Sequence, residues 1–464
     1  EARVRAEERP YTLQCPVCFI PGTDPEAEEI IFSAHLFEGY VKQGANDNKS
    51  GCAAILEIAR TLHRLIESGR IPRPRRTIRF LWGPEFSGTG PWVKANRDLM
   101  EKTLCNINLD MVGEWLSLNQ AHFCLMRTTY GNPHYINDVM ENYYRFVGEG
   151  NRERIHRAGT RFPYSYPRRI VAPFGADEPF IYSIETHYGA SDHEVFNDWS
   201  VQVPGVMMIA WPDQWYHTSG DRVNKSDPTQ LKRVAVIGAA AAYTIASADE
   251  DDAVRLASEI VSNGTGRLGH QLMRGIQALN EADAAGLGKT YRQAWVYLIT
   301  AVRNEKNTLD SLHELAPTGT ALASHVKLMK QAVDEMGRTH LKTIEAHMRS
   351  VAAGLGVEPA DIVWSDEELD AQKIIPMPTS RVREKGYRGY RDYLDAVPKD
   401  VQKKYTYRRG NIASTGELQC LINGENSVLD IKLMLDSQYE KESILEDILK
   451  YLELLKSAEL ITYK

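Results

Sequence analysis

The sequence has few cysteines and no long apolar run. Its six cysteines in 464 residues are too few for the disulfide framework of a small secreted scaffold. Every apolar stretch is interrupted well before the ~20 residues that a membrane-spanning helix needs, so we expect no membrane partner. No segment ahead of the first apolar run resembles a signal sequence. This favours a cytoplasmic location, although the chain starts at Glu1 rather than at a methionine.

A large excess of charge of one sign is also missing. The chain carries 55 Lys and Arg against 62 Asp and Glu, a net charge of −7, and 43% of its residues are hydrophobic. This is ordinary globular composition, which excludes collagen-like, low-complexity and wholly disordered chains. A mildly acidic protein is a poor general binder of polyanions. The length predicts two or three domains at ~150 residues each.

Two of the cysteines lie close together in the sequence. Cys15 and Cys18 form a single C-P-V-C, which fits half a zinc knuckle, a redox pair, or a buried strand that carries two small thiols. The sequence has no second C-x-x-C that would complete a four-thiolate site. We therefore favour the buried strand, since free cysteine behaves as a small apolar residue.

Strands and helices alternate along residues 1–245. Runs of β-branched and aromatic residues predict four strands, at 30–34, 77–82, 103–109 and 205–210. Apolar residues at steps of three and four predict a helix over 50–68. Alternation of this kind predicts an α/β domain with a mostly parallel, mixed sheet covered by helices on both faces. In such sheets, ligands bind outside the carboxyl ends of the strands.

The rest of the chain divides into two further regions. Residues 246–365 are rich in Ala, Leu, Glu, Lys and Arg, and predict several packed helices with breaks at 263–266 and 317–320. Residues 366–464 predict a basic linker followed by a winged-helix-like domain. Its main elements would be a long amphipathic helix at 442–457 and a final strand at 460–463.

The basic linker is rich in tyrosine. Residues 371–410 hold 11 basic and 4 acidic residues with five interleaved tyrosines. They could bind nucleic acid, or pack against an acidic face of the same molecule or of a second copy. The 54 residues that follow hold 5 basic and 10 acidic residues, whereas a recognition helix should be basic. We therefore expect no nucleic-acid partner, favour a dimerisation or substrate-gating role, and leave homo-oligomerisation open.

Five segments of the first half carry a His, Asp or Glu where a sheet presents its ligands. These residues are His35, Asp47, Glu85, Asp110 and His217. Two imidazoles and three carboxylates suit zinc or a similar cation, and an unligated carboxylate nearby can accept a proton from water held by the metal. Any one of them alone is more often a cap, a turn former or a satisfied polar group. The prediction of a metal site therefore depends on the ordered set.

The order of these motifs resembles the co-catalytic zinc exopeptidases, which include bacterial leucine aminopeptidases, glutamate carboxypeptidase and glutaminyl cyclase. The matching segments are S-A-H at 33–35, G-A-N-D-N-x-S-G at 44–51, F-L-W-G-x-E at 80–85, N-L-D-M-V-G at 108–113, G-x-S-D-H-x-x-F at 189–196 and Y-H-T-x-x-D at 216–221. The resemblance covers about residues 28–245. Some bacterial aminopeptidase-like proteins carry a similar winged-helix end.

The resemblance implies a set of metal ligands. Asp47 would bridge two zinc ions. His35 and Asp110 would complete the ligands of one ion, and His217 would bind the other.

The resemblance also implies catalytic and substrate-binding residues. Glu85 would be the general base, which takes a proton from the attacking water and returns it to the leaving amine. Tyr216 would direct its hydroxyl at the developing oxyanion, and Asp192 and His193 would lie beside a peptide substrate. The implied function is a metallo-aminopeptidase, which hydrolyses the peptide bond next to a free α-amino group.

Two positions depart from the family pattern. The second Glu of the family's E-E pair, normally a metal ligand, is Phe86, and the Asp of its H-x-D is replaced by Phe37. The site that shares His217 is therefore one protein ligand short. It either binds metal weakly or recruits a further carboxylate. The candidates are Glu38, Glu85, Glu114 and Asp192.

Two other functions stay open. The same scaffold could serve an amidohydrolase or a glutaminyl cyclase that acts on a small amide. Alternatively, Phe86 could mark a catalytically lapsed, peptidase-like protein that binds a partner instead of hydrolysing a substrate.

Overall fold

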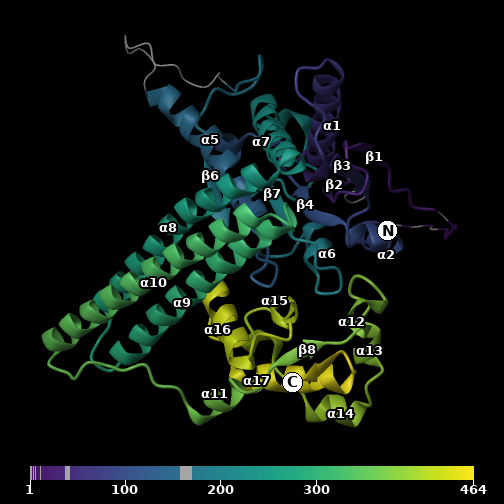
Figure 1. Cartoon of the computed structure of the whole chain (residues 1–464). Helices are drawn as coiled ribbons and strands as arrows, with labels where there is room; N and C mark the ends of the chain where they lie inside the picture. Colours follow the sequence, from purple (N-terminus) through teal and green to yellow (C-terminus); the bar gives the residue numbers. More distant parts are fainter. Residues whose placement is uncertain (1–2, 4, 6, 11, 37–41, 157–169) are drawn as a thin grey trace.

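The structure is a computed structural model that describes the chain except for residues 1–2, 4, 6, 11, 37–41 and 157–169, with the backbone alone at 151–156. Within this part of the chain, seven strands form one mixed sheet in the N-terminal half (Figure 1). In chain order they are β1 (Val17–Ile20), β2 (Glu29–His35), β3 (Thr77–Gly83), β4 (Thr103–Leu109), β5 (His122–Met126), β6 (Tyr182–Glu185) and β7 (Gly205–Trp211).

The strands lie in the spatial order β1-β3-β2-β4-β7-β5-β6. β3, β2, β4 and β7 are parallel to one another, whereas β1 runs antiparallel to β3 and β5 antiparallel to β7. The prediction of a mixed, mostly parallel sheet is confirmed, as are the four predicted strands.

Helices cover both faces of the sheet. On one face α1 (Gly51–Glu67), α5 (Ile136–His156) and α7 (Pro228–Ser247) pack together. On the other lie α2 (Thr89–Ala95) and α6 (His193–Asn197). Two short helices, α3 (Arg97–Met100) and α4 (Leu116–Asn119), flank β4.

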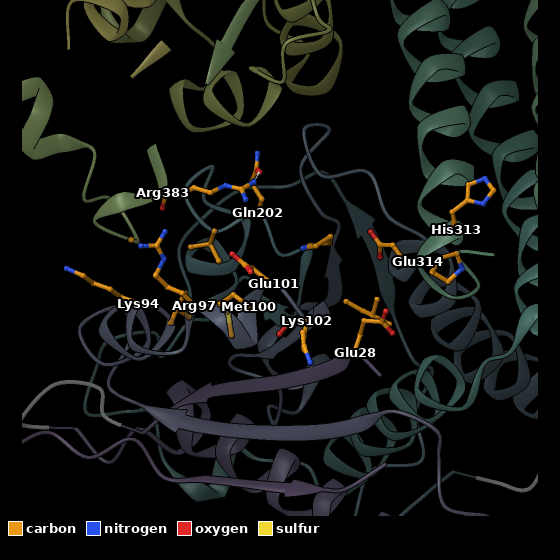
Figure 2. Close-up of a pocket in the computed structure, with 18 residues that line it drawn as sticks. Glu28, Lys94, Arg97, Met100, Glu101, Lys102, Gln202, His313, Glu314 and Arg383 are labelled. Atoms are coloured by element: carbon orange, nitrogen blue, oxygen red, sulfur yellow. Dashed lines mark hydrogen bonds between the residues drawn. The ribbon is translucent and has the colours of Figure 1, made fainter. Parts of the chain in front are cut away.

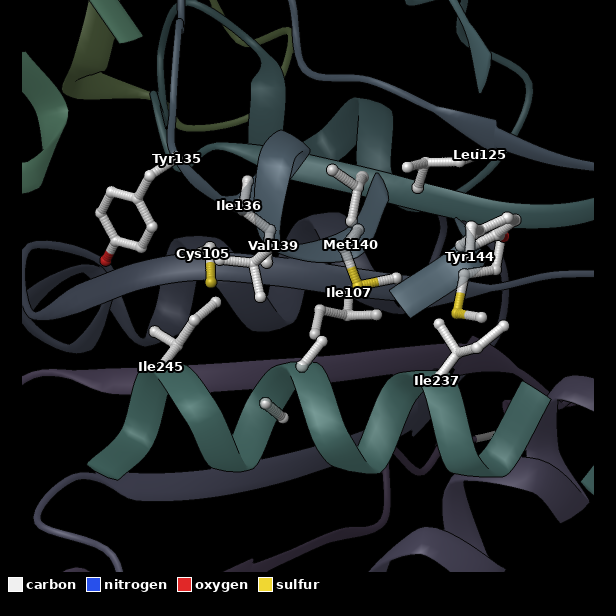
Figure 3. Close-up of a cluster of buried hydrophobic side chains, with 14 of the residues drawn as sticks. Cys105, Ile107, Leu125, Tyr135, Ile136, Val139, Met140, Tyr144, Ile237 and Ile245 are labelled. Carbon is white, nitrogen blue, oxygen red and sulfur yellow. The ribbon is translucent and has the colours of Figure 1, made fainter. Parts of the chain in front are cut away.

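Alternation along β2 sorts its side chains between the two faces. Ile30 and Phe32 belong to the large core beneath α1, α5 and α7, whereas Ile31 packs with Phe196 of α6 in a smaller core. Figure 3 shows part of the large core, where Ile107 of β4 lies between side chains of α5 and α7. Because His35 has the same parity as Ile31, it lies on the α6 side of the sheet.

The edge of the sheet carries the two neighbouring cysteines. Cys15 is half-buried and Cys18 is exposed, and both thiols are free. The prediction of a buried strand at this point is wrong, because β1 is an edge strand with three of its four residues exposed. No helix in the described ranges is long and apolar enough to cross a membrane.

Three long helices extend from the sheet as an arm (Figure 1). They are α8 (Glu250–Glu281), α9 (Leu287–Ser311) and α10 (Thr320–Leu355). The predicted break at 317–320 is confirmed, but the one at 263–266 is wrong, because α8 is continuous there. Gly264 serves packing instead: a Cβ at this position would lie 2.8 Å from Oε2 of Glu305 on α9.

The C-terminal module contains several short helices and a two-stranded sheet. Its elements are α11 (Asp366–Ala371), β8 (Pro376–Pro378), α12 (Arg381–Glu384), α13 (Arg391–Asp395), α14 (Lys399–Lys404), α15 (Thr415–Leu421), α16 (Val428–Tyr439), α17 (Leu445–Ser457) and β9 (Ile461–Tyr463). β8 pairs with β9 in antiparallel fashion. The predicted final helix and strand are present. The winged-helix assignment and the domain boundaries near residues 245 and 365 stay predictions.

Candidate metal centre

The ends of two neighbouring strands bring His35 and Asp110 together. His35 is the last residue of β2, Asp110 directly follows β4, and the two strands are parallel. Nε2 of His35 lies 3.3 Å from Oδ1 of Asp110 and 3.4 Å from Oδ1 of Asp47. All three side chains are buried.

His217 approaches the other oxygen of the same carboxylate. Its Nε2 lies 3.2 Å from Oδ2 of Asp47, and its side chain is 49% exposed. The ring of Tyr216 stacks on the His217 ring with 3.7 Å between centroids. Residues that are far apart in the sequence therefore converge at the carboxyl ends of the parallel strands, with Tyr216 and His217 at the solvent-exposed rim of the group.

Glu85 follows β3 and adds a further carboxylate. One oxygen of Glu85, one ring nitrogen of His35 and one oxygen of Asp110 all lie within 4.8 Å of one another. The Glu85 loop is held by Asp192, whose Oδ1 accepts a 2.9 Å hydrogen bond from the backbone N–H of Phe86. Burial raises the pKa of Asp192 to about 6.

The two residues expected beside the substrate, Asp192 and His193, are both buried. Nε2 of His193 lies 2.9 Å from the carbonyl oxygen of Tyr188, and its ring centroid lies 5.3 Å from that of His187. Burial lowers the pKa of His193, which favours the neutral imidazole at neutral pH. A direct contact between either residue and a substrate stays a prediction.

The loop that carries Asp47 is tied to the end of β4. Nδ2 of Asn48 donates to the carbonyl oxygen of Leu109 at 2.9 Å, and its Oδ1 accepts from the N–H groups of Gly51 and Met111 at 3.0 and 3.1 Å. A Cβ at Gly51 would lie 2.2 Å from the Leu109 oxygen, so this close approach requires glycine. The small and amide residues of the motif therefore fix the position of Asp47.

Asp221 holds the same loop from the other side. Its Oδ1 accepts from the N–H of Asn46 at 2.6 Å, and its Oδ2 accepts from the N–H of Asp47 at 3.0 Å. The Asp221 side chain is buried. It is the last residue of the Y-H-T-x-x-D motif, and its fixed spacing from His217 is the signal that could have predicted this role.

The centre strongly favours positive charge. Burial lowers the pKa of His35, but the neighbouring carboxylates of Asp110 and Asp47 outweigh that effect and raise it to about 12. Burial also raises the pKa of Asp47, whereas hydrogen bonds from His35 and Lys42 bring it below its ordinary value. A proton or a metal cation satisfies such a group of carboxylates, and a metal ion would displace the His35 proton.

The donor atoms fit one zinc ion. Two ligand atoms that each lie about 2.1 Å from a tetrahedral zinc ion are about 3.4 Å apart. The distances of 3.3 and 3.4 Å from Nε2 of His35 to the oxygens of Asp110 and Asp47 match that spacing. Among the described residues, the ligand atoms that lie within 4.8 Å of one another belong to His35, Glu85 and Asp110. His35 and Asp110 would therefore hold the ion, and either Glu85 or Asp47 would complete its ligands.

The second oxygen of Asp47 has a cationic partner that the sequence did not predict. Nζ of Lys42 lies 2.9 Å from Oδ2 of Asp47, and the Lys42 side chain is only 5% exposed. Phe86, at the position of the family's ligand Glu, stacks on Tyr387 with 6.4 Å between ring centroids.

Of the four carboxylates considered as substitutes for the missing ligand, Glu85 lies at the centre, whereas the other three are engaged elsewhere or are not described. Asp192 accepts the hydrogen bond from the Phe86 backbone. Glu114 accepts from Nδ2 of Asn119, and burial together with the charge of Asp213 raises its pKa to about 9, so its carboxyl is protonated at neutral pH. Glu38 lies outside the described residues.

The C-terminal module contacts the loops around the centre. The hydroxyl of Tyr387 donates to Oε1 of Glu194 at 3.2 Å, and Arg388 forms an ion pair with the same oxygen. The Arg388 guanidinium also lies 5.9 Å from the centroid of the Phe86 ring. Of the alternatives for the basic, tyrosine-rich stretch, these contacts show packing against an acidic group of the same chain.

A cavity of about 640 Å³ lies near the amino-terminal ends of the parallel strands, away from the metal centre (Figure 2). Glu28 and Thr103, near the amino-terminal ends of β2 and β4, line it together with Glu314, just after α9, and Arg383 of the C-terminal module. None of its lining residues belongs to the metal centre. It lies at the amino-terminal ends of the strands, whereas ligands of such sheets bind at the carboxyl ends. We therefore do not assign the predicted reaction to this cavity.

Comparisons with known proteins point to one family for the first half of the chain. Residues 17–242 match the family model of Peptidase family M28. No curated protein sequence matches the chain.

Solved structures of peptidases and a cyclase are similar to this chain. An aminopeptidase from Aneurinibacillus sp. strain AM-1 has 22% identity over 49% of this chain and 47% of that chain, with a TM-score of 0.36. A putative peptidase from Clostridium acetobutylicum has 14% identity over 97% and 60%, with a TM-score of 0.36. A Bacteroides thetaiotaomicron glutaminyl cyclase has 17% identity over 50% and 83%, with a TM-score of 0.31. The chain thus spans less than two thirds of the length of the first two.

Proposed function

We propose that the protein is a metal-dependent peptidase whose centre lies at the sheet edge around Asp47. The observation that carries this proposal is the position of Nε2 of His35, which lies 3.3 and 3.4 Å from oxygens of Asp110 and Asp47, at the spacing of ligands on one zinc ion. The match of residues 17–242 to Peptidase family M28 supports it independently.

Each side chain of the centre has a task in amide hydrolysis. Zinc supplies a Lewis acid that polarises a carbonyl and brings the pKa of the water it holds to about 7. His35 and Asp110 would hold the ion, with Asp47 or Glu85 beside them. Glu85, which is half-buried, accepts a proton from the attacking water and gives it to the departing amine nitrogen. Tyr216, at the exposed rim, donates a hydrogen bond to the developing oxyanion.

The finer function that we propose is that of an aminopeptidase, which follows from the resemblance to the bacterial enzymes. A panel of matched peptides with free and acetylated N-termini tests it. An aminopeptidase cleaves the free peptides and leaves the blocked ones intact. Cleavage of both sets, or the release of ammonia from a small amide, would instead indicate an amidohydrolase or a cyclase.

The role of Glu85 is tested by Glu85→Gln, which removes the proton acceptor but keeps the size of the side chain. We expect turnover to fall by about 10²–10⁴-fold while the zinc content, measured by elemental analysis, is unchanged. Glu67→Gln, at an exposed glutamate of α1, is the matched control and should behave as wild type.

Each other outcome of that experiment is informative. Unchanged turnover would remove Glu85 from the mechanism, and loss of zinc would make it a ligand instead of a base. A wild-type protein that holds no metal, and that stays inert on the whole peptide panel after zinc is added, would favour the lapsed, binding-only alternative.

A further inference from the structure

The position beside Oδ2 of Asp47, where a second metal ion would lie, is taken by a side chain of this protein. We propose that the ammonium group of Lys42 replaces the second metal ion, so that each chain binds one zinc ion. The inference rests on the proposed function, because it concerns the same centre. It differs from the two-zinc arrangement that the resemblance implies.

The first argument is geometric. The two oxygens of Asp47 face different partners: Oδ1 lies 3.4 Å from Nε2 of His35, whereas Oδ2 lies 2.9 Å from Nζ of Lys42 and 3.2 Å from Nε2 of His217. A zinc ion on Oδ2 would lie about 2.0–2.2 Å from that oxygen. It would share this space with the ammonium group, which repels a dication at such short range.

The second argument is burial. The side chains of Lys42 and Asp47 are 5% and 3% exposed. An ammonium group so far from water is stable only when it is paired, and the Asp47 carboxylate provides that pairing. Expelling Lys42 to make room for a metal ion would therefore cost both the ion pair and the packing around it.

The third argument is charge balance. In the family pattern, a dication and the ligand glutamate together add one positive charge to the centre. Here Phe86 contributes no charge and the Lys42 ammonium contributes one. The Lys42 ammonium, in the loop before α1, therefore supplies the positive charge that the dication and the glutamate would supply together.

The chemical consequence concerns what each half of the centre can do. An ammonium group donates hydrogen bonds and keeps Asp47 ionised, but it offers no vacant orbital to a substrate oxygen. On this assignment the single zinc ion lies on the His35 side of Asp47, with His35 and Asp110 among its ligands, and His217 is not a ligand. Lewis-acid chemistry is then confined to the His35 side of Asp47.

Metal stoichiometry tests the proposal. The chelated full chain is titrated with zinc in a calorimeter, and its content after gel filtration is measured by elemental analysis. We expect one zinc ion per chain in wild type, in His217→Ala and in the control Lys49→Met, an exposed lysine of the same loop. Asp110→Asn should weaken binding at least tenfold.

The decisive experiment asks whether the protein can be made to bind a second metal ion. The double variant Lys42→Met with Phe86→Glu removes the ammonium and restores the ligand, so it should bind two ions. Loaded with cobalt, it should show the spin coupling of a metal pair that wild type lacks. Circular dichroism and the melting temperature confirm that the variant is folded.

The outcomes separate this inference from the proposed function. Two zinc ions in an active wild-type protein, or one ion in a folded double variant, would overturn the role of Lys42 and leave the peptidase proposal intact. No bound zinc and no turnover in wild type would overturn both.

Discussion

Asp221 acts on the proposed metal centre through the backbone of another loop. Its two carboxylate oxygens accept the N–H groups of Asn46 and Asp47, so it is a positioning residue that touches no metal. Burial raises its pKa, although these two N–H donors oppose the effect. A carboxylate in this position orients the Asp47 side chain before any metal arrives.

Asp221→Asn replaces one acceptor oxygen with an NH₂ group, which cannot accept from a backbone N–H. We expect the zinc affinity to fall by about 10–100-fold, measured by competition with a chromophoric chelator, whereas turnover at saturating zinc should change much less. Asp98→Asn, at an exposed aspartate, serves as the control. An unchanged affinity would show that the Asp47 loop holds its shape without Asp221.

The residues of the centre could be predicted to different extents. His35 ends β2 and Asp110 directly follows β4, where α/β sheets place ligands, whereas Asp47 and His217 are predicted through motifs. Lys42 could not be predicted, since it lies in a loop without periodicity and its role depends on Asp47 of the same loop. The burial of His193 also depends on packing that no local pattern records.

At the scale of elements, α15 depends on a buried carboxyl group. Oε1 of Glu417 accepts from the N–H of Gly131 at 2.8 Å, and Oε2 accepts from Nε2 of Gln438 on α16 at 3.0 Å. Burial raises the pKa of Glu417 to about 7, against which these hydrogen bonds act. The group thus binds its proton more tightly in the folded chain than in the unfolded one.

This shift predicts a pH-dependent stability. The contribution of Glu417 is fully present below its unfolded pKa near 4.5 and is lost as the pH rises through about 7, by up to about 3 kcal/mol. Glu417→Gln does not titrate. Its melting temperature relative to wild type should therefore rise between pH 4.5 and pH 8, whereas Glu425→Gln, at an exposed glutamate, should follow wild type. If the melting temperatures of wild type and Glu417→Gln changed with pH in the same way, the raised pKa of Glu417 would be refuted.

The elements themselves were predictable where their sequence pattern is local. The β2 and β4 strands and the α1 helix follow from runs and spacings that need no knowledge of the fold. The continuity of α8 does not, because Asn263 and Gly264 favour a break in isolation. Nδ2 of Asn263 donates to Oδ1 of Asp138 on α5 at 3.1 Å, so tertiary contacts override the local preference.

At the scale of the whole molecule, the C-terminal module contacts both the arm and the α/β part of the chain. On α16, Oγ of Ser437 accepts a 2.6 Å hydrogen bond from Oγ1 of Thr300 on α9. On its other side, Tyr387 and Arg388 contact Glu194 of α6. The module therefore contacts the 189–197 segment, which lies next to the proposed metal centre.

Removing the Tyr387 ring should loosen that loop. Tyr387→Ala loses the stacking on Phe86 and the hydrogen bond to Glu194, together on the order of 2 kcal/mol. We expect amide hydrogen exchange over 189–197 to become at least several-fold faster at unchanged zinc content. The control Tyr393→Ala removes a tyrosine that packs on Arg381 instead. Equal exchange in both variants would argue against the coupling.

The arm is anchored to α5, one of the helices that cover the sheet. Nη1 of Arg267 on α8 donates to Asp138 and Glu141 of α5 at 2.9 Å each. The α/β part, the arm and the module thus each contact the other two (Figure 1). A shift of the arm relative to the sheet would therefore have to be accommodated at the module's contact with Glu194.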